Sequence, residues 1–189
     1  MMTTMTRDVF FIHIPKCAGI SVHQACPDAI NHWHADCDYY ARQYGERWQT
    51  GFKFAVVRHP FDRFVSAFSY LKQQTPAHRF WEDDRQRRKA LEPFDNINAA
   101  VNGAADFVHM LHFRPQRSWL GNWLPDFILH FERLAEDWRA LQTLFPSFAS
   151  LAKLNASQHA DYRTLLTPQS RQQLGRWYAE DLRLFGYTD

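Results

Sequence analysis

The sequence predicts an α/β fold in which helices flank a central, mainly parallel sheet, because short apolar runs alternate with segments of helical periodicity. Three runs are typical of buried strands, and they cover residues 9–14, 51–57 and 127–131. Strands that are separated by helices pair in parallel, so we expect one sheet. No repeat, low-complexity tract or linker interrupts the chain, and residues 1–189 are therefore expected to form a single domain.

Helical periodicity predicts the elements that join and follow these strands. Helices are expected over residues 21–29, 36–44, 61–71 and 96–111, after Glu132, and from Thr167, an N-cap followed by Pro168. In the helix over 61–71 the phenylalanines share one face, which places Ser66 on another. The polar segment 73–93 is expected to be a solvated loop or helix, with contact to a substrate as the alternative.

The composition argues against several classes of protein. A formal net charge of +2 is too small to indicate nucleic-acid binding. Three cysteines, an odd number, do not suggest a disulfide framework and favour a reducing compartment. No apolar run approaches the length of a membrane span, and the residues before Val9 do not resemble a signal peptide. We therefore expect a soluble, cytoplasmic protein.

The first strand ends in a tight turn that is suited to bind an anion. Pro15 stops the strand, Lys16 stands at the mouth of the turn, and Ala18 and Gly19 let the backbone approach a ligand. Ser21 can cap or enter the helix that follows. A lysine and the N–H groups of a helix N-terminus together favour phosphate or sulfate. The alternative is an ordinary strand–helix turn with a solvent-exposed lysine.

The order of residues in this turn differs from the Walker A pattern of nucleoside triphosphatases. That pattern requires a glycine, four residues and then Gly-Lys-Ser/Thr, whereas in KCAGIS the lysine precedes the glycine. The turn is therefore expected to be a related loop with a different ligand. A small-molecule kinase with a degenerate phosphate loop and a nucleotide-binding protein without turnover remain alternatives.

A second pair of residues extends the interpretation to a second phosphate. Arg58 follows the second strand, and Ser66 lies eight residues further on in RHPFDRFVSAF. If that strand neighbours the first, both side chains can point toward the same edge of the sheet as the turn. Arginine binds two phosphate oxygens at once and serine donates to a third. An arginine paired with Asp62 and a serine packed on a helix face are the alternative.

FIHIPKCAGIS and FAVVRHPFDRFVSAFSYL resemble the two cofactor motifs of the PAPS-dependent sulfotransferase superfamily, closest to its carbohydrate-sulfotransferase branch and bacterial relatives. The resemblance continues through NHWHADCDYY, HFRPQ, HFERLAEDWRAL and LNASQHADY. It implies a stand-alone, P-loop-like sulfotransferase domain that moves the sulfuryl group of 3′-phosphoadenosine 5′-phosphosulfate (PAPS) to an acceptor hydroxyl. The product is 3′,5′-bisphosphoadenosine (PAP), and the implied acceptor is a carbohydrate or glycoconjugate.

The resemblance also assigns roles to single residues. The expected contacts of the 5′-phosphosulfate are Lys16, Cys17, Ala18, Gly19, Ile20 and Ser21, and those of the 3′-phosphate are Arg58 and Ser66. Lys16 is also suited to neutralise the leaving-group oxygens during catalysis. The family's loop usually reads Pro-Lys-Thr-Gly-Gly-Thr-Ser, so two threonine hydroxyls are replaced here by Cys17 and Ile20. More of the binding therefore falls to Lys16 and Ser21.

A base must take the proton of the acceptor hydroxyl, and histidine has a suitable unperturbed pKa. The family often has a histidine before a helix at the position of NHWHADCDYY, which indicates His34, with His32 as its rival. A metal site of His32, His34 and Cys37 is an alternative, but no familiar zinc pattern supports it and we expect no metal. His13 is expected at the sheet edge or in the core.

The acceptor, a small molecule or a glycan, is expected to meet aromatic and basic residues. His112 and Arg114 lie in a segment that resembles the acceptor side of the family, or else in a helix terminus packed against Trp119. Trp119, Trp123 and the basic passage near Arg85 would suit a sugar or an anionic glycan, and core edges are the alternative for the tryptophans. Asn155 and Ser157 fall where the family's chain returns toward the nucleotide.

Overall fold

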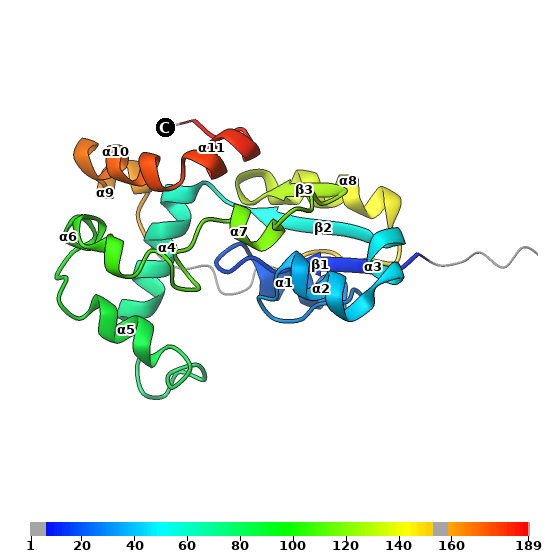
Figure 1. The fold of residues 1–189 in the computed structure, drawn as a ribbon, viewed down its shortest axis with the longest axis horizontal. Coiled ribbons are helices and arrows are strands. Elements are labelled where there is room, and N and C mark those ends of the chain that lie inside the picture. The colour runs from blue at the N-terminus through cyan, green and yellow to red at the C-terminus, as the bar shows by residue number, and fades with distance from the viewer. Residues whose placement is uncertain (1–6, 153–158, 189) are drawn as a thin grey trace, which may run out of the picture. The chain divides into compact units, whose positions relative to one another are not determined.

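The structure is a computed structural model that describes residues 7–152 and 159–188, and its chain forms two compact units (Figure 1). The first unit comprises Met1–Arg58 and Gln116–Asn155, and the second comprises His59–Pro115 and Ala156–Asp189. The single domain expected over residues 1–189 stays a prediction. No helix in the described ranges is long and apolar enough to cross a membrane.

A parallel sheet of three strands organises the first unit and confirms the expected α/β class. The strands are β1 (Val9–Ile12), β2 (Phe52–Val57) and β3 (Phe127–His130), in the order β1-β2-β3. Every residue of the central strand β2 is buried, because β2 has a neighbour on each side and is covered on both faces. Ile30 adds an isolated parallel bridge to Phe10, at the free edge of β1.

Short helices cover this sheet, and Figure 1 shows α8 beside β3. The helices of the first unit are α1 (Gly19–Ala25), α2 (Cys37–Tyr44), α3 (Glu46–Thr50), α7 (Arg117–Leu120) and α8 (Leu134–Leu144), with a 3-10 turn, η2 (Phe131–Arg133). Asp36 caps α2 by accepting a hydrogen bond from the N–H of Tyr39 at 2.8 Å, as the expected helix start requires. The expected helix over 21–29 begins earlier, at Gly19, and ends earlier, at Ala25.

The second unit is helical. Its elements are α4 (Pro60–Gln73), α5 (Arg85–Leu91), α6 (Ile97–Asn102), η1 (Ala104–Asp106), α9 (Tyr162–Leu165), α10 (Pro168–Trp177) and α11 (Ala179–Phe185). Its core joins Phe64 of α4, Val101 of α6 and Leu174 of α10, all of which are buried. Thr167 caps α10 by accepting from the N–H of Ser170 at 3.1 Å, which confirms the expected start of this helix.

Two sequence-based expectations about these helices are wrong. The helix expected over 96–111 ends at Asn102, because Gly103 takes non-helical angles and the chain continues as the 3-10 turn η1. The last helix breaks at Tyr178, where φ is −106° and ψ is 21°. Ser66, which helical spacing placed on another face than the phenylalanines, is fully buried, because α4 packs apolar residues around more than one face. The segment 73–93, which was expected to be a loop or a helix, contains the helix α5.

Candidate functional site

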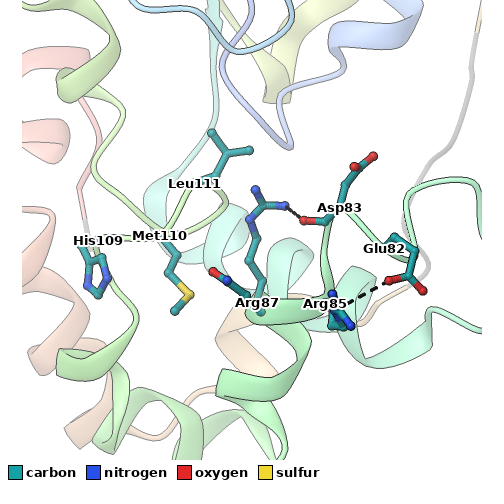
Figure 2. A pocket seen from close by; sticks show the side chains of 8 residues that line it. Glu82, Asp83, Arg85, Arg87, His109, Met110 and Leu111 are labelled. Carbon is teal, nitrogen blue, oxygen red and sulfur yellow. Dashed lines mark hydrogen bonds and ion pairs between the residues drawn. The ribbon is translucent and has the colours of Figure 1, made fainter.

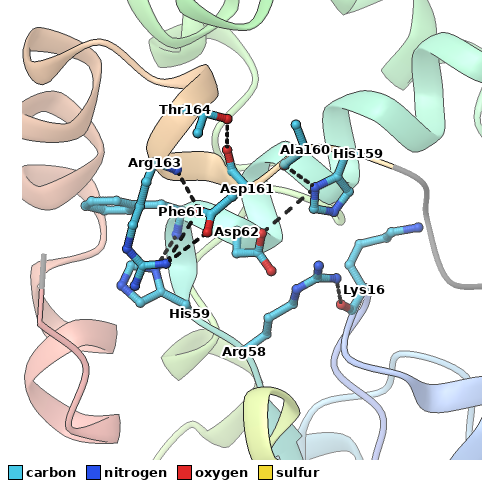
Figure 3. A network of polar contacts seen from close by, with 10 residues as sticks. All are labelled: Lys16, Arg58, His59, Phe61, Asp62, His159, Ala160, Asp161, Arg163 and Thr164. Carbon is cyan, nitrogen blue, oxygen red and sulfur yellow. Dashed lines mark hydrogen bonds and ion pairs between the residues drawn. The ribbon is translucent and has the colours of Figure 1, made fainter.

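The loop after β1 and Arg58 after β2 meet at one edge of the sheet. β1 and β2 are parallel neighbours, so their carboxyl ends lie at the same edge, as the sequence interpretation required. Arg58 Nη1 donates a hydrogen bond to the carbonyl oxygen of Lys16 at 3.1 Å (Figure 3). The guanidinium carbon of the buried Arg58 lies 4.1 Å from the ring centre of Phe131. The structure thus brings the guanidinium of Arg58 against the backbone of the loop that carries Lys16.

The backbone of this site is strained. In the described part of the chain, non-glycine residues with positive φ occur at Lys16 (68°), Ala18 (58°) and His34 (63°). Such left-handed conformations cost on the order of 1–3 kcal/mol each and cluster where function requires a fixed backbone. All three are residues that sequence analysis assigned to cofactor binding or catalysis. The strained backbone therefore favours this loop region as a candidate functional site.

Gly19 makes a close approach to a protein group. A Cβ at Gly19 would lie 1.6 Å from His13 Nε2, so the imidazole fills the space that any side chain would need. The sequence interpretation attributed this glycine to the approach of a ligand, and the structure gives the neighbouring ring as its reason. Ser21 is buried inside α1, whose N-cap is Ala18, so Ser21 enters the helix and does not cap it.

His34 reaches the same edge because of the short pairing at Ile30. Ile30 runs parallel to β1, with its N–H donating to Val9 O at 2.8 Å, so the residues that follow continue toward the carboxyl end of the sheet. His34 Nδ1 lies 3.0 Å from the carbonyl oxygen of His13, and Trp119 Nε1 donates to His34 O at 3.2 Å. With Nδ1 donating to that carbonyl, Nε2 carries the lone pair of the neutral ring.

The rival histidine is engaged elsewhere. His32 Nε2 lies 2.6 Å from the hydroxyl of Tyr44, and its backbone N–H donates to the hydroxyl of Tyr40 at 2.8 Å. These contacts give His32 a structural role at the start of α2, whereas the contacts of His34 fix a ring beside the loop. The geometry favours His34 over His32 as the candidate base.

His13, which was expected at the sheet edge or in the core, is a core residue. It is 4% exposed, and its ring centre lies 4.5 Å from that of His34. Burial, and then the nearby His34 and His23, hold the pKa of His13 well below 6.5, so this ring is neutral. Its Nδ1 is buried and has no hydrogen-bond partner in the described part of the chain.

The environment of Cys37 does not favour the alternative metal site of His32, His34 and Cys37. Burial and then the charge of Asp36 raise the pKa of Cys37 to about 12, which opposes the thiolate that zinc requires. Within residues 7–152 and 159–188, no three His, Cys, Asp or Glu side chains gather in a way that could hold a metal ion.

Gln116 is a part of this site that sequence analysis missed. Its side chain is fully buried, and its oxygen accepts from the backbone N–H of Arg58 at 2.9 Å. Its amide nitrogen donates to the carbonyl of Arg58 at 2.8 Å, and Cys17 Sγ donates to its oxygen at 3.4 Å. The signal available in the sequence is its place in HFRPQ, a segment that the resemblance includes without a role for the glutamine.

Other candidates lie in the second unit. Ser66 is buried in α4, and its approach to Arg58 stays a prediction. His112 Nδ1 is 3.8 Å from Asp84, and the carbonyl of Arg114 accepts from Arg63 at 3.0 Å, so both contribute to packing there. In the first unit Trp119 is fully buried, so the core-edge alternative holds for it and not the sugar platform. Asn155 and Ser157 lie outside the described residues.

The second unit also contains a pocket of about 400 Å³ (Figure 2). It is lined by Glu82, Asp83, Arg85, Gln86, Arg87, His109, Met110 and Leu111. The two arginines are engaged: Arg85 Nε lies 3.7 Å from Glu82, and Arg87 Nη1 donates to the carbonyl of Asp83 and to the carboxylate of the buried Asp84. The lining of this pocket thus carries charges of both signs, and its two arginines are paired within the second unit.

Comparison with known proteins finds a family model that matches nearly the whole chain. A family model described as "Sulfotransferase family" matches residues 1–188. The matched range includes both units and every candidate residue described above. No curated protein and no solved structure matches the chain.

Proposed function

Because the chain belongs to the sulfotransferase family, whose model covers residues 1–188, we propose that it transfers the sulfuryl group of PAPS to a carbohydrate or glycoconjugate hydroxyl. The observation that carries the proposal is the hydrogen bond between Arg58 and the carbonyl of Lys16. It unites the two cationic motifs at the carboxyl edge of β1 and β2, where ligands of open α/β sheets bind.

The residues present fit a donor that carries negative charge at both ends. Lys16 and the N–H groups of the strained loop would hold the 5′-phosphosulfate, and Arg58 with Ser66 would hold the 3′-phosphate. When bound, PAPS supplies the sulfuryl group. The side chain of Lys16 extends away from the carbonyl that Arg58 binds (Figure 3).

The chain's own residues would then handle the proton and the developing charge. His34 Nε2 takes the proton from the acceptor hydroxyl, and the carbonyl of His13 stabilises the imidazolium through Nδ1. The neutral ring of His13 contributes no competing positive charge. Lys16 neutralises the negative charge that remains on the leaving phosphate, a role that preorganised cations play in related transfers.

PAP binding tests the donor site. The unfolding temperature of the wild-type chain should rise with PAP and not with Mg-ATP. A ligand that binds the native state stabilises it, by about 2.7 kcal/mol when the ligand concentration is 100 times Kd. Arg58→Ala should weaken PAP binding roughly tenfold to a hundredfold, since hydrogen bonds to charged groups contribute about 1.5–3 kcal/mol. Arg47→Ala, at an exposed arginine paired with Asp8, is the matched control. Equal PAP affinity in Arg58→Ala would remove Arg58 from the site.

The assignment of the base requires a separation of binding from transfer. His34→Ala should bind PAP as the wild type does and lose transfer to the acceptor. His32→Ala serves as the control and should retain transfer, because its ring contacts Tyr44. If PAP binding and transfer fall together in His34→Ala, the residue is structural.

A nucleotide-binding protein without sulfuryl transfer, including a kinase-like one, is the second candidate. The observation that favours it is the loss of two loop hydroxyls, because Cys17 is buried with its thiol turned to Gln116. Stabilisation by Mg-ATP, or PAP binding with no transfer to any acceptor, would support this candidate.

The carbohydrate acceptor is supported by the resemblance of the two motifs to the carbohydrate-sulfotransferase branch. Neutral sugars, sulfated glycans and lipid alcohols should be screened with labelled PAPS. We expect transfer to a sugar, and transfer to lipid alcohols alone would contradict this part of the proposal. The three free cysteines, all buried, support work in a reducing compartment such as the cytoplasm.

A further inference from the structure

Gln116 joins the two halves of the candidate donor site, and neither the family match nor the motifs give it a role. We infer that Gln116 is a positioning residue, which fixes Arg58 against the loop that carries Lys16. The inference rests on the proposed function only in its choice of PAP as a probe.

The side-chain amide of Gln116 makes two hydrogen bonds to the backbone of one residue, Arg58. The Gln116 amide accepts from the N–H of Arg58 at 2.9 Å and donates to the carbonyl of Arg58 at 2.8 Å. Both backbone groups of Arg58 lie just beyond the end of β2, where the ladder to a neighbouring strand no longer satisfies them. The side-chain amide replaces that neighbour and so sets the direction in which the arginine leaves the sheet.

Gln116 also contacts the loop after β1, through the thiol of Cys17. Cys17 Sγ donates to the same Gln116 oxygen at 3.4 Å, and the thiol is also 3.6 Å from the carbonyl of Pro15. Cys17 is 1% exposed, so its side chain points into the protein and leaves the backbone of the loop to face a ligand. This contact gives the cysteine a function where the family usually has threonine: it ties the loop to Gln116.

A hydrogen bond from Arg58 to the loop completes a ring of contacts. Arg58 Nη1 donates to Lys16 O at 3.1 Å, so a ring of contacts runs from Gln116 to Arg58, to Lys16, to Cys17 and back to Gln116. Removing Gln116 takes one hydrogen-bond partner from each backbone group of Arg58 in a buried place, and it takes from the Cys17 thiol its contact with this amide. The side chain of Gln116 contacts the backbone of Arg58 and the thiol of Cys17, so we expect it to act on binding through Arg58 and the loop.

Binding of PAP to Gln116→Ala, Arg58→Ala and the double variant tests this coupling. Gln116→Ala should weaken PAP binding about tenfold in the wild-type background, the effect of losing one net hydrogen bond of about 1.4 kcal/mol. In the Arg58→Ala background the same change should have less than a threefold effect, because the residue that Gln116 positions is gone. Equal loss in both backgrounds would overturn the inference, since it would show that Gln116 acts without Arg58.

Gln142→Ala is a matched control for the loss of a bracing amide. Gln142 donates to the carbonyls of Phe148 at 2.9 Å and Ala149 at 3.3 Å, after α8 in the same unit. It should lower the unfolding temperature without changing PAP affinity. A loss of PAP affinity as large as that of Gln116→Ala would show that general loosening explains both variants, and would overturn the inference.

A second measurement needs no nucleotide. Native alkylation by iodoacetamide, followed by mass spectrometry, reports on Cys17, Cys26 and Cys37, which are all buried. Gln116→Ala should raise the rate at Cys17 at least tenfold relative to the other two. An unchanged rate at Cys17, or an equal rise at all three, would overturn the inference. If wild-type chain fails to bind PAP, the proposed function fails, while this rate still decides the role of Gln116.

Discussion

The replacement of Gly19 by alanine tests the packing that supports the candidate site. The new Cβ would lie 1.6 Å from Nε2, 2.0 Å from Cδ2 and 2.4 Å from Cε1 of His13, where ordinary contacts begin at 3.4 Å. Because His13 is 4% exposed, its ring has little room to move. Overpacking of a filled core costs about 1–3 kcal/mol, so Gly19→Ala should reduce the free energy of unfolding by that amount.

Gly175 provides the matched control. It lies inside α10, and a Cβ there would meet its nearest neighbour, Phe61 Cζ, at 3.8 Å, an ordinary contact. Gly175→Ala should therefore stabilise the chain by roughly 0.5–1 kcal/mol, the helix preference of alanine over glycine. The two glycine-to-alanine changes are thus expected to have opposite signs.

Equilibrium unfolding in urea measures both effects. The double variant Gly19→Ala/His13→Ala should be more stable than the sum of the two single changes predicts, because removal of the ring makes room for the methyl group. A Gly19→Ala chain as stable as the wild type, or an additive double variant, would refute the account of this contact.

Three further predictions concern His13, α2 and the thiols. The depressed pKa of His13 means that the unfolded chain binds a proton that the folded chain rejects; stability should therefore fall as pH drops below 6.5, by up to about 1.4 kcal/mol per pH unit. In pH-dependent urea unfolding, His13→Phe should flatten this slope, and an unchanged slope would contradict the assignment. Asp36→Ala should lower the free energy of unfolding by about 1 kcal/mol in the same assay, because the N–H of Tyr39 loses its capping acceptor. An unchanged free energy of unfolding would show that this cap does not stabilise the chain. Cys26 and Cys37, whose pKa burial raises to about 12, should resist iodoacetamide at pH 8 until the chain unfolds; rapid native labelling would show that they are accessible.

Local signals in the sequence predicted the parts of the site that depend on neighbouring residues. An apolar run ending in Pro15 and a lysine before a glycine indicated the strand–turn–helix at β1, and the same logic located Arg58 after β2. Parallel strands then brought the two together, because their carboxyl ends share an edge. The three-stranded parallel sheet was likewise predictable from the alternation of strands and helices.

Contacts between distant residues left no such signal. Gln116 is 58 residues from Arg58 and 99 from Cys17, and a single buried amide has no periodicity that a sequence pattern could reveal. The environment of Ser66 was left open for a related reason: helical spacing placed it away from the phenylalanines, but it did not reveal that α4 is covered on more than one face.

Transfer from labelled PAPS tests the central claim most directly. Wild-type chain and His34→Ala, at equal occupancy by PAPS, should be given the same mixture of glycan acceptors. We expect label in the glycan with the wild type and none above background with His34→Ala. Transfer at equal rates by the two chains would contradict the role of His34, and the absence of transfer by PAPS-saturated wild-type chain to any acceptor would contradict the proposed function itself.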